Sequence, residues 1–356
     1  MTSGNVTRLI AFSLAASATA GAHAAVRFSD CLKQPAGWYA TDEARDLAEN
    51  VIRYQAPEGG WPKNRDMTLP PEAHHDSKET PLPTIDNDAT TTQLELLARV
   101  ISAGRGEPVF KEAFLRGFDY LLAAQYENGG WPQFFPLRKG YYAHVTFNDD
   151  AMVNVLALLR DCAKGMPPFA GVGIDAERCE RAARAFEKGV ECILRCQVTL
   201  DGVKTAWCAQ HDVHSLEPAW ARNYEPPSLS GMESVGIVRF LMQIESPDPS
   251  VVAAIESAVE WFGTAAIEGL RVERFVGADG KRDVRTFPDQ DAPRVWARFY
   301  DLETGAPVFT GRDRVPRARL DDIEYERRNG YGYLGDWPAK LLEREYPKWR
   351  KNHGLP

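Results

Sequence analysis

A rigid, polar stretch from Glu217 to Glu233 carries side chains that could do acid–base chemistry. Pro226 and Pro227 hold their part of the backbone extended, so the stretch is expected to be a stiff loop and not a helix. The loop presents four consecutive residues with polar or aromatic side chains: Arg222, Asn223, Tyr224 and Glu225. Two interpretations are open: Arg222 pairs with a neighbouring glutamate on the surface, or it faces a ligand beside the next helix.

Two shorter motifs, Asp86-Asn87-Asp88 and Asn148-Asp149-Asp150, also precede predicted helices. Asp88 and Asp150 occupy the same place in the two motifs, and we interpret them as helix N-caps. The residues before them are Asp-Asn in one motif and Asn-Asp in the other, although a cap requires neither. Two carboxylates and two amides at one site would supply the hard oxygen ligands that calcium prefers, outside any EF-hand pattern.

An internal repeat places these motifs in a common unit. Residues 55–62 and 125–132 share the pattern Gln-x-x-x-Gly-Gly-Trp-Pro, and a fainter third copy runs from Cys196 through Trp207 to Ser230. A Gln-x-x-x-Gly-x-Trp pattern is also seen in terpene-cyclase toroids, where it ties helices together, so Trp61 and Trp131 are expected to be structural. Lys63 follows the first turn where the second copy has a glutamine, which marks this lysine as a specific departure from the repeat.

Helical patterns dominate the chain, and each copy of the repeat alternates a helix, a turn, a long loop and a second helix. Apolar residues recur at helical spacing in seven segments: 41–55, 88–102, 108–125, 149–164, 175–197, 230–244 and 249–267. Ser230 and Glu233 have the spacing of a capping box at the sixth of these helices. Strand patterns are short: 272–276, 284–287 and 295–300. These features predict a mainly α-helical α/α toroid, with the loops before its inner helices gathered at one mouth. An open α-solenoid would need shorter and more regular loops.

The chain has 356 residues and the composition of a globular protein. Residues 1–24 resemble a cleavable signal peptide, with the small-x-small pattern Ala22-His23-Ala24 at its end. We therefore expect a single catalytic domain at residues 25–356, in a secreted or periplasmic, bacterial, monomeric protein. No later stretch is long and apolar enough to span a membrane.

The charge pattern argues against nucleic acid as a partner, because the formal net charge is −8 and no basic stripe dominates. Six arginines nevertheless fall within a loop-rich segment that has only three acidic residues: Arg294, Arg298, Arg312, Arg314, Arg317 and Arg319. Such a segment could be a solvated surface or could bind an anionic ligand. The six cysteines do not have zinc-site spacing, and the sequence does not determine whether they form disulfides.

Taken together, the motifs resemble the pectate lyases of polysaccharide lyase family 10. The resemblance covers about residues 38–340 and rests on six segments: Gly-Gly-Trp-Pro-Lys-Asn (59–64), Thr-Ile-Asp-Asn-Asp-Ala-Thr (84–90), Phe-Asn-Asp-Asp-Ala-Met (147–152), Trp-Ala-Arg-Asn-Tyr-Glu-Pro-Pro-Ser-Leu-Ser-Gly (220–231), Trp-Ala-Arg-Phe-Tyr-Asp-Leu (296–302) and Gly-Arg-Asp (311–313). It implies an (α/α)3 toroid and calcium-assisted β-elimination of polygalacturonate, an acidic polysaccharide.

The resemblance also implies roles for individual residues. Arg222 would remove the proton from C5 of a galacturonate unit, and Asp149 and Asp86 would bind Ca2+. Four further residues would hold neighbouring uronates: Lys63, Asn87, Arg298 and Arg312. Arginine normally stays protonated in proteins, so we expect burial among calcium, Lys63 and Arg312 to lower the pKa of Arg222.

Two other functions fit the same residues. An inverting glycoside hydrolase would need two carboxylates in acid and base roles, for which Glu225 and Asp149 are candidates. A non-catalytic pectin-binding module would bind polygalacturonate without turnover. The products separate these alternatives, because only elimination creates an unsaturated uronide that absorbs ultraviolet light.

Overall fold

The computed structural model describes residues 26–73 and 82–355, so the expected signal peptide lies outside the described residues. All seven predicted helices are confirmed, with ends that shift by a few residues. The helices are α1 (Asp42–Arg53), α2 (Thr91–Val100), α3 (Pro108–Ala124), α4 (Ala151–Ala163), α5 (Ala176–Cys196), α6 (Glu233–Leu241), α7 (Pro249–Thr264), α8 (Tyr325–Gly330) and α9 (Tyr346–Asn352). Within the described residues, no helix is long and apolar enough to cross a membrane.

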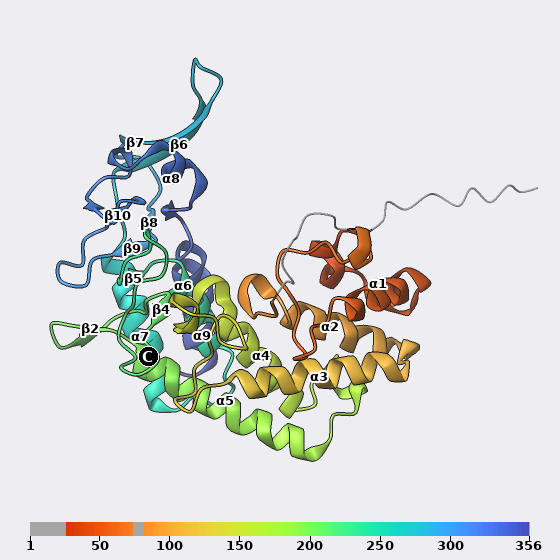
Figure 1. Cartoon of the computed structure of the whole chain (residues 1–356). Helices are drawn as coiled ribbons and strands as arrows, with labels where there is room; N and C mark the ends of the chain where they lie inside the picture. Colours follow the sequence, from red (N-terminus) through yellow and green to blue (C-terminus); the bar gives the residue numbers. More distant parts are fainter. Residues whose placement is uncertain (1–25, 74–81, 356) are drawn as a thin grey trace, which may run out of the picture.

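The long helices form two layers (Figure 1). In one layer α2 packs on α4 and α4 packs on α6, and in the other α1, α3, α5 and α7 pack in that order. Consecutive helices alternate between the layers, and α1–α2, α2–α3, α4–α5 and α6–α7 all pack across the boundary. This is the alternation that the sequence repeat predicts, and it makes α2, α4 and α6 equivalent inner helices.

The tryptophan of each repeat fixes a loop to the helix before it. The indole Nε1 of Trp61 donates to the carbonyl of Val51 in α1 at 2.8 Å, and Trp131 makes the same bond to Leu121 in α3. Trp207 bonds to the carbonyl of Ile193 near the end of α5, so the fainter third copy is confirmed. A fourth copy, which the sequence did not reveal, joins two further residues: Trp296 and Phe262 of α7.

The glutamine and glycine of the same turn join neighbouring helices of the outer layer. Gln55 Nε2 donates to the carbonyl of Ala113 in α3, and Gln125 Nε2 donates to that of Ala185 in α5. Gly129 adopts a φ of 92°, and a Cβ atom there would lie 2.1 Å from the carbonyl oxygen of Lys188. Only glycine allows this approach without displacing α5. The structural role expected for these turns is therefore confirmed.

The strands pair in two-stranded antiparallel sheets, and all of them except β6 and β7 have two residues. They are β1 (Val145–Thr146), β2 (Thr199–Leu200), β3 (Val203–Lys204), β4 (Gln210–His211), β5 (Leu229–Ser230), β6 (Leu270–Val276), β7 (Arg282–Pro288), β8 (Trp296–Ala297), β9 (Phe299–Tyr300), β10 (Phe309–Thr310), β11 (Pro316–Arg317) and β12 (Leu334–Gly335). The hairpin of β6 and β7 projects from the body of the molecule (Figure 1). The pairing of β5 with β9 joins the end of the Arg222 loop to the strand just after Arg298.

The six cysteines are free thiols. Cys192 and Cys196 lie one turn apart on the buried face of α5, with their sulfur atoms 4.0 Å apart. The core therefore rests on apolar packing of the two helical layers and on the buried tryptophans.

Candidate active site

Two short 3-10 turns precede the first two inner helices: η4 (Asp86–Asp88) before α2 and η7 (Asn148–Asp150) before α4. The two turns pack against each other, and η7 also packs on α6. The loops before the inner helices therefore meet at one end of the layer, as the sequence predicts. The second residues of the turns, Asn87 and Asp149, have φ values of 52° and 50°. Asparagine and aspartate are among the few residues that often adopt this left-handed conformation.

The buried amide of Asn148 joins the two candidate metal ligands. Its Nδ2 atom lies 2.8 Å from an oxygen of Asp149 and 3.4 Å from an oxygen of Asp86. The two carboxylates, which are distant in sequence, therefore converge on one point. Burial raises the pKa of Asp149, and the guanidinium of Arg298 opposes this effect.

Asp88 and Asp150 do not cap their own helices, so that prediction is wrong. Neither side chain accepts a hydrogen bond from the first turn of the following helix, because the left-handed backbone at both residues is not the extended conformation of an N-cap. Each instead contacts the fourth residue of the next inner helix. Asp88 accepts a bond of 2.8 Å from Asn154 of α4, and Asp150 lies so close to Gly236 of α6 that a Cβ atom there would be 1.8 Å from its Oδ1.

Lys63 reaches the same point from the first Gly-Gly-Trp-Pro turn. Its Nζ forms an ion pair with the second oxygen of Asp86, whose side chain is only 3% exposed. The ring centroid of Phe134, in the next copy, lies 5.9 Å from this Nζ. The lysine that departs from the repeat therefore contacts a candidate metal ligand directly.

Arg298 contacts the other candidate metal ligand, Asp149. It forms an ion pair with Glu233 at the start of α6 and lies 3.6 Å from Asp149. The predicted capping box is confirmed only in part: Ser230 Oγ accepts the backbone N–H of Glu233 at 3.0 Å, but the Glu233 carboxylate binds Arg298 and the Ser230 hydroxyl. Burial is the largest single effect on the pKa of Arg298 and would lower it, but the charge and hydrogen bond of Glu233, together with Tyr331 and Asp149, raise the pKa overall.

Arg222 is held by Glu225, which confirms the expected pairing with a neighbouring glutamate. Its Nε lies 2.7 Å from Glu225 Oε2, and its Nη2 contacts the other carboxylate oxygen. Tyr331 donates its hydroxyl to Glu225 at 2.8 Å, and the face of its ring lies 4.6 Å from the Arg298 guanidinium and 5.5 Å from that of Arg222. Tyr331 therefore connects the candidate base to the carboxylate cluster.

The lowering of the Arg222 pKa by calcium stays a prediction, but the protein's own side chains shift this pKa in the opposite direction. Burial acts to lower the pKa, but the hydrogen bond and the charge of Glu225 outweigh burial and raise the pKa above its ordinary value. Lys63 bonds to Asp86 and Arg312 to Glu326, so neither cation faces Arg222 closely enough to oppose Glu225. The pKa of Glu225 shifts in the opposite direction. Burial raises it, but the hydrogen bonds and charge of Arg222 outweigh burial, so the net shift is downward.

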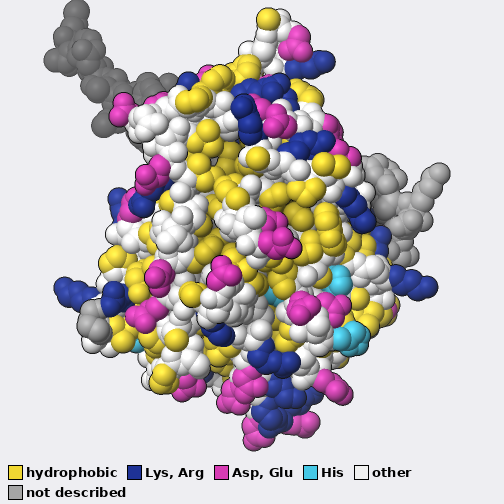
Figure 2. Space-filling model, turned by 90° about the vertical axis from the view of Figure 1, so that its left-hand side faces the viewer, with side chains coloured by type: hydrophobic (Ala, Val, Ile, Leu, Met, Phe, Trp, Pro, Cys, Tyr) yellow, Lys and Arg dark blue, Asp and Glu magenta, His cyan; other side chains and the backbone are white. Residues whose placement is uncertain are grey.

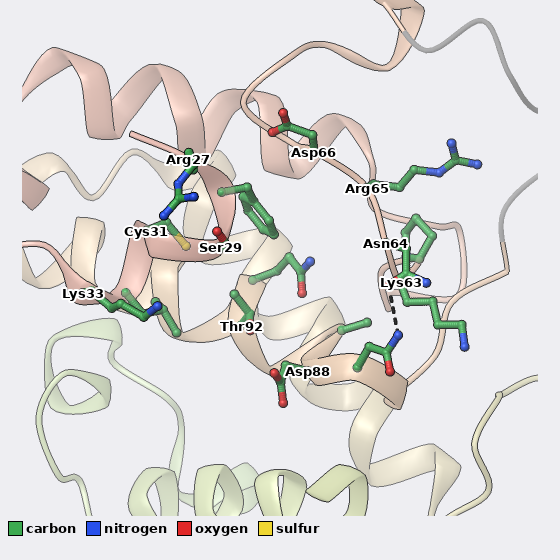
Figure 3. Close-up of a pocket in the computed structure, with 16 residues that line it drawn as sticks. Arg27, Ser29, Cys31, Lys33, Lys63, Asn64, Arg65, Asp66, Asp88 and Thr92 are labelled. Atoms are coloured by element: carbon green, nitrogen blue, oxygen red, sulfur yellow. Dashed lines mark hydrogen bonds between the residues drawn. The ribbon is translucent and has the colours of Figure 1, made fainter. Parts of the chain in front are cut away.

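The last two predicted site residues, Asn87 and Arg312, are exposed to solvent. Asn87 is exposed and its amide bonds to Asn64 at 3.0 Å. It lies beside an open cleft of about 620 Å3, between the N-terminal 3-10 helix η1 (Phe28–Lys33) and the start of α2 (Figure 3). The side chains at this cleft include several cations: Arg27, Lys33, Lys63 and Arg65.

Arg312 is bound to Glu326 at 2.9 Å, and its guanidinium lies 5.5 Å from the ring of Tyr224. The arginine-rich segment is therefore less basic than the sequence suggests, because carboxylates such as Glu233 and Glu326 come to it from other segments. Figure 2 shows basic and acidic side chains intermixed on the face that it draws.

Sequence reasoning missed Tyr331 and assigned Glu233 only to a cap. Tyr331 lies in a segment without a repeat or a recognised motif, so no sequence signal pointed to it. Glu233 was visible as a capping residue, but its partner Arg298 is 65 positions away along the chain. Contacts of such long range depend on the fold.

An α/α fold whose loops gather arginine and lysine around carboxylates is suited to an acidic carbohydrate. The chain belongs to the pectic acid lyase family, whose model matches residues 55–342. This membership makes it a polysaccharide lyase by family, which favours elimination over the two alternative functions.

Two solved structures are similar over nearly the whole chain. The first is a family 10 polysaccharide lyase from Cellvibrio cellulosa, with 32% identity and a TM-score of 0.75 over 90% of this chain and 96% of that one. The second is a mutant of a family 10 polysaccharide lyase from the same organism in complex with trigalacturonic acid, with 31% identity and a TM-score of 0.76 over 93% of this chain and 99% of that one. No curated protein matches the chain.

Proposed function

We propose that this enzyme cleaves polygalacturonate by calcium-dependent β-elimination and releases 4,5-unsaturated oligogalacturonides. One observation carries the proposal: contacts connect Lys63, Asp86, Asp149, Arg298 and Arg222 through Asn148 and Tyr331. The network therefore joins two carboxylates to three cations through one amide and one tyrosine. The complex of a similar lyase with trigalacturonic acid supports the same class of substrate.

The residues present fit a calcium ion that is shared with the substrate. Asp86 and Asp149 converge on one amide, which places two hard carboxylate ligands together. Within the described residues, no group of three or more metal-binding side chains is close enough to hold an ion unaided. A galacturonate carboxylate and water would complete the ligand set. Calcium bound there would neutralise this carboxylate and stabilise negative charge at the reacting carbon.

Residues of the chain would bind the substrate, stabilise the transition state and remove the proton. Lys63 and Arg298 each contact one member of the carboxylate pair, where each can bind a uronate carboxylate and stabilise the enolate-like transition state. Asn87 and Arg312 would bind uronates farther along the chain. Arg222 would take the proton from C5, and the electron pair of that C–H bond would form the C4–C5 double bond. The C4–O bond would break with its electrons on the glycosidic oxygen, which would take a proton from water.

The hydrogen bonds of Arg222 set a condition on its role as base. Glu225 keeps Arg222 charged in the free enzyme, so only a small neutral fraction is available at neutral pH. Activity should therefore be greatest under alkaline conditions. The same bonds orient the guanidinium, because Glu225 holds two of its nitrogens and is itself held by Tyr331.

The geometry also argues against hydrolysis with Glu225 as the acid. A general acid must be protonated at working pH, but the pKa of Glu225 is lowered by Arg222.

We also propose that the three helix pairs α1–α2, α3–α4 and α5–α6 form an (α/α)3 toroid, which the two packed layers support.

The test is to incubate the enzyme with polygalacturonate and follow ultraviolet absorbance, with and without a chelator. We expect absorbance to rise with calcium, to stop with the chelator and to resume when calcium is added back. Full activity in dialysed, chelator-treated enzyme would rule out the metal. New reducing ends without ultraviolet absorbance would rule out elimination.

A further inference from the structure

Arg314 differs from most of the site's arginines in its partners. Arg222, Arg298, Arg312 and Arg317 are all paired with carboxylates: Glu225, Glu233, Glu326 and Asp313. Within the described part of the chain, Arg314 forms no ion pair, and its Nε donates to the neutral Asn223 Oδ1 at 2.9 Å. Its guanidinium is also 5.3 Å from the ring of Trp220.

These two contacts orient the guanidinium and leave much of it available. The indole face of Trp220 attracts a cation, and the bond to Asn223 fixes the Nε edge. Its two terminal nitrogens remain free to donate to a carboxylate in the paired geometry that arginine favours. Binding there breaks no ion pair, whereas Glu326 already occupies two nitrogens of Arg312.

The backbone at Arg314 is unusual for an arginine. Its φ is 62°, in the left-handed region where glycine meets no steric cost. Arginine is held there although glycine would suit the turn better. Strain of this kind is often found where a side chain has a function.

Arg314 contacts one residue before and one residue after the proposed base in the sequence. Trp220 and Asn223 flank Arg222 in the stiff loop, so their contacts hold Arg314 against the segment that carries the proposed base. Polygalacturonate carries a carboxylate on every sugar. We propose that Arg314 forms an additional subsite, which binds the carboxylate of a galacturonate adjoining the catalytic unit; this rests on the proposed function.

The test compares Arg314→Gly with wild type on polygalacturonate. Glycine accepts the left-handed backbone, so the variant should fold at least as stably, which a melting curve checks. We expect KM to rise about fivefold with kcat nearly unchanged. Arg314→Lys should fall between the two, because it keeps the charge but not the planar fork. Arg184→Ala, at an exposed arginine of α5 that pairs with Glu180 at 3.6 Å, is the matched control and should keep the wild-type KM.

A second comparison asks whether Arg314 recognises a carboxylate. Methyl esters remove the charge of the uronates, so the difference between wild type and Arg314→Gly should shrink on highly esterified pectin. Wild-type KM values for Arg314→Gly on polygalacturonate, or an equal rise on both substrates, would overturn the subsite. If the wild-type enzyme binds polygalacturonate without cleaving it, the proposed function is wrong. The subsite still predicts a weaker Kd for Arg314→Gly, measured by calorimetry, and an unchanged Kd overturns it.

Discussion

The turns η4 and η7 have nearly the same backbone, but the aspartate and the asparagine at their first two positions are exchanged. The buried first position is Asp86 in η4 and Asn148 in η7, and the left-handed second position is Asn87 in η4 and Asp149 in η7. The side chain of Asp86 is 3% exposed, whereas that of Asp149 is 38% exposed. The exchange brings one carboxylate from each turn to the same amide.

This difference shows how a repeated scaffold produces one asymmetric site. Two aspartates at the first position would face each other across the η4–η7 contact and repel, since both positions are buried. With Asn148 there, an amide separates and orients the two carboxylates. Lys63, which also has no counterpart in the second copy, partly balances their charge.

The largest effect should come from making the two turns alike at their second position. Asp149→Asn keeps the size of the side chain but removes one carboxylate, so we expect kcat on polygalacturonate to fall by about 10²–10³-fold. Calcium binding, measured by calorimetry in the presence of trigalacturonate, should weaken in parallel. The matched control is Asp46→Asn, the same change at an exposed aspartate of α1 outside the site, which should change kcat by less than about threefold. If the two variants lose activity equally, the exchange of acid and amide has no functional meaning.

The loop before the third inner helix, α6, differs from η4 and η7 because it carries the proposed base, Arg222. It should therefore determine how kcat depends on pH. Because Glu225 raises the pKa of Arg222, the neutral fraction of Arg222 should increase about tenfold for each pH unit below that pKa. We therefore expect kcat to rise with a slope near one up to at least about pH 9, without a plateau. Glu225→Gln removes the anion that raises the pKa, so its profile should move to lower pH. A wild-type plateau near neutral pH would identify a different base.

Lys63 tests the other departure from the repeat. Lys63→Gln gives the first turn the residue of the second, removes the cation beside Asp86 and should lower kcat/KM by about tenfold, or about 1.4 kcal/mol. Lys63→Arg keeps the charge and should retain more activity than Lys63→Gln. Equal activity of Lys63→Gln and wild type would mean that the lysine only balances the charge of Asp86.

The repeat made much of this fold predictable. Seven helices, the structural tryptophans and the meeting of the inner-helix loops all follow from local periodicity and from motifs such as the turn at Gln55. The fourth tryptophan link was not visible, because the segment before Trp296 has a glutamine at the repeat spacing, Gln290, but lacks the paired glycines of the first two copies. The sequence therefore predicts well the features that recur along the chain.

The site was less predictable, because its contacts join segments that share no motif. Arg298 and Glu233, or Tyr331 and Glu225, meet only through the pairing of distant strands and loops. The direction of the Arg222 pKa shift also depended on which charges lie nearest, and those positions come from the fold. The role of Asp88 was misread because the left-handed backbone of η4 has no sequence signal beyond its Asn and Asp residues.

The smallest effect should come from the third position, where the two turns behave alike. Asp88→Ala removes the bond from Asn154 of α4 and should cost about 0.5–1.5 kcal/mol of unfolding free energy, as should Asn154→Ala. The double variant should cost clearly less than the sum, because both changes remove the same contact between inner helices. If Asp88 were an N-cap of α2, its loss would instead add fully to that of Asn154, since the two would act on different helices. Chemical denaturation of the four proteins measures the coupling, and a value near zero would restore the cap in place of the link between α2 and α4.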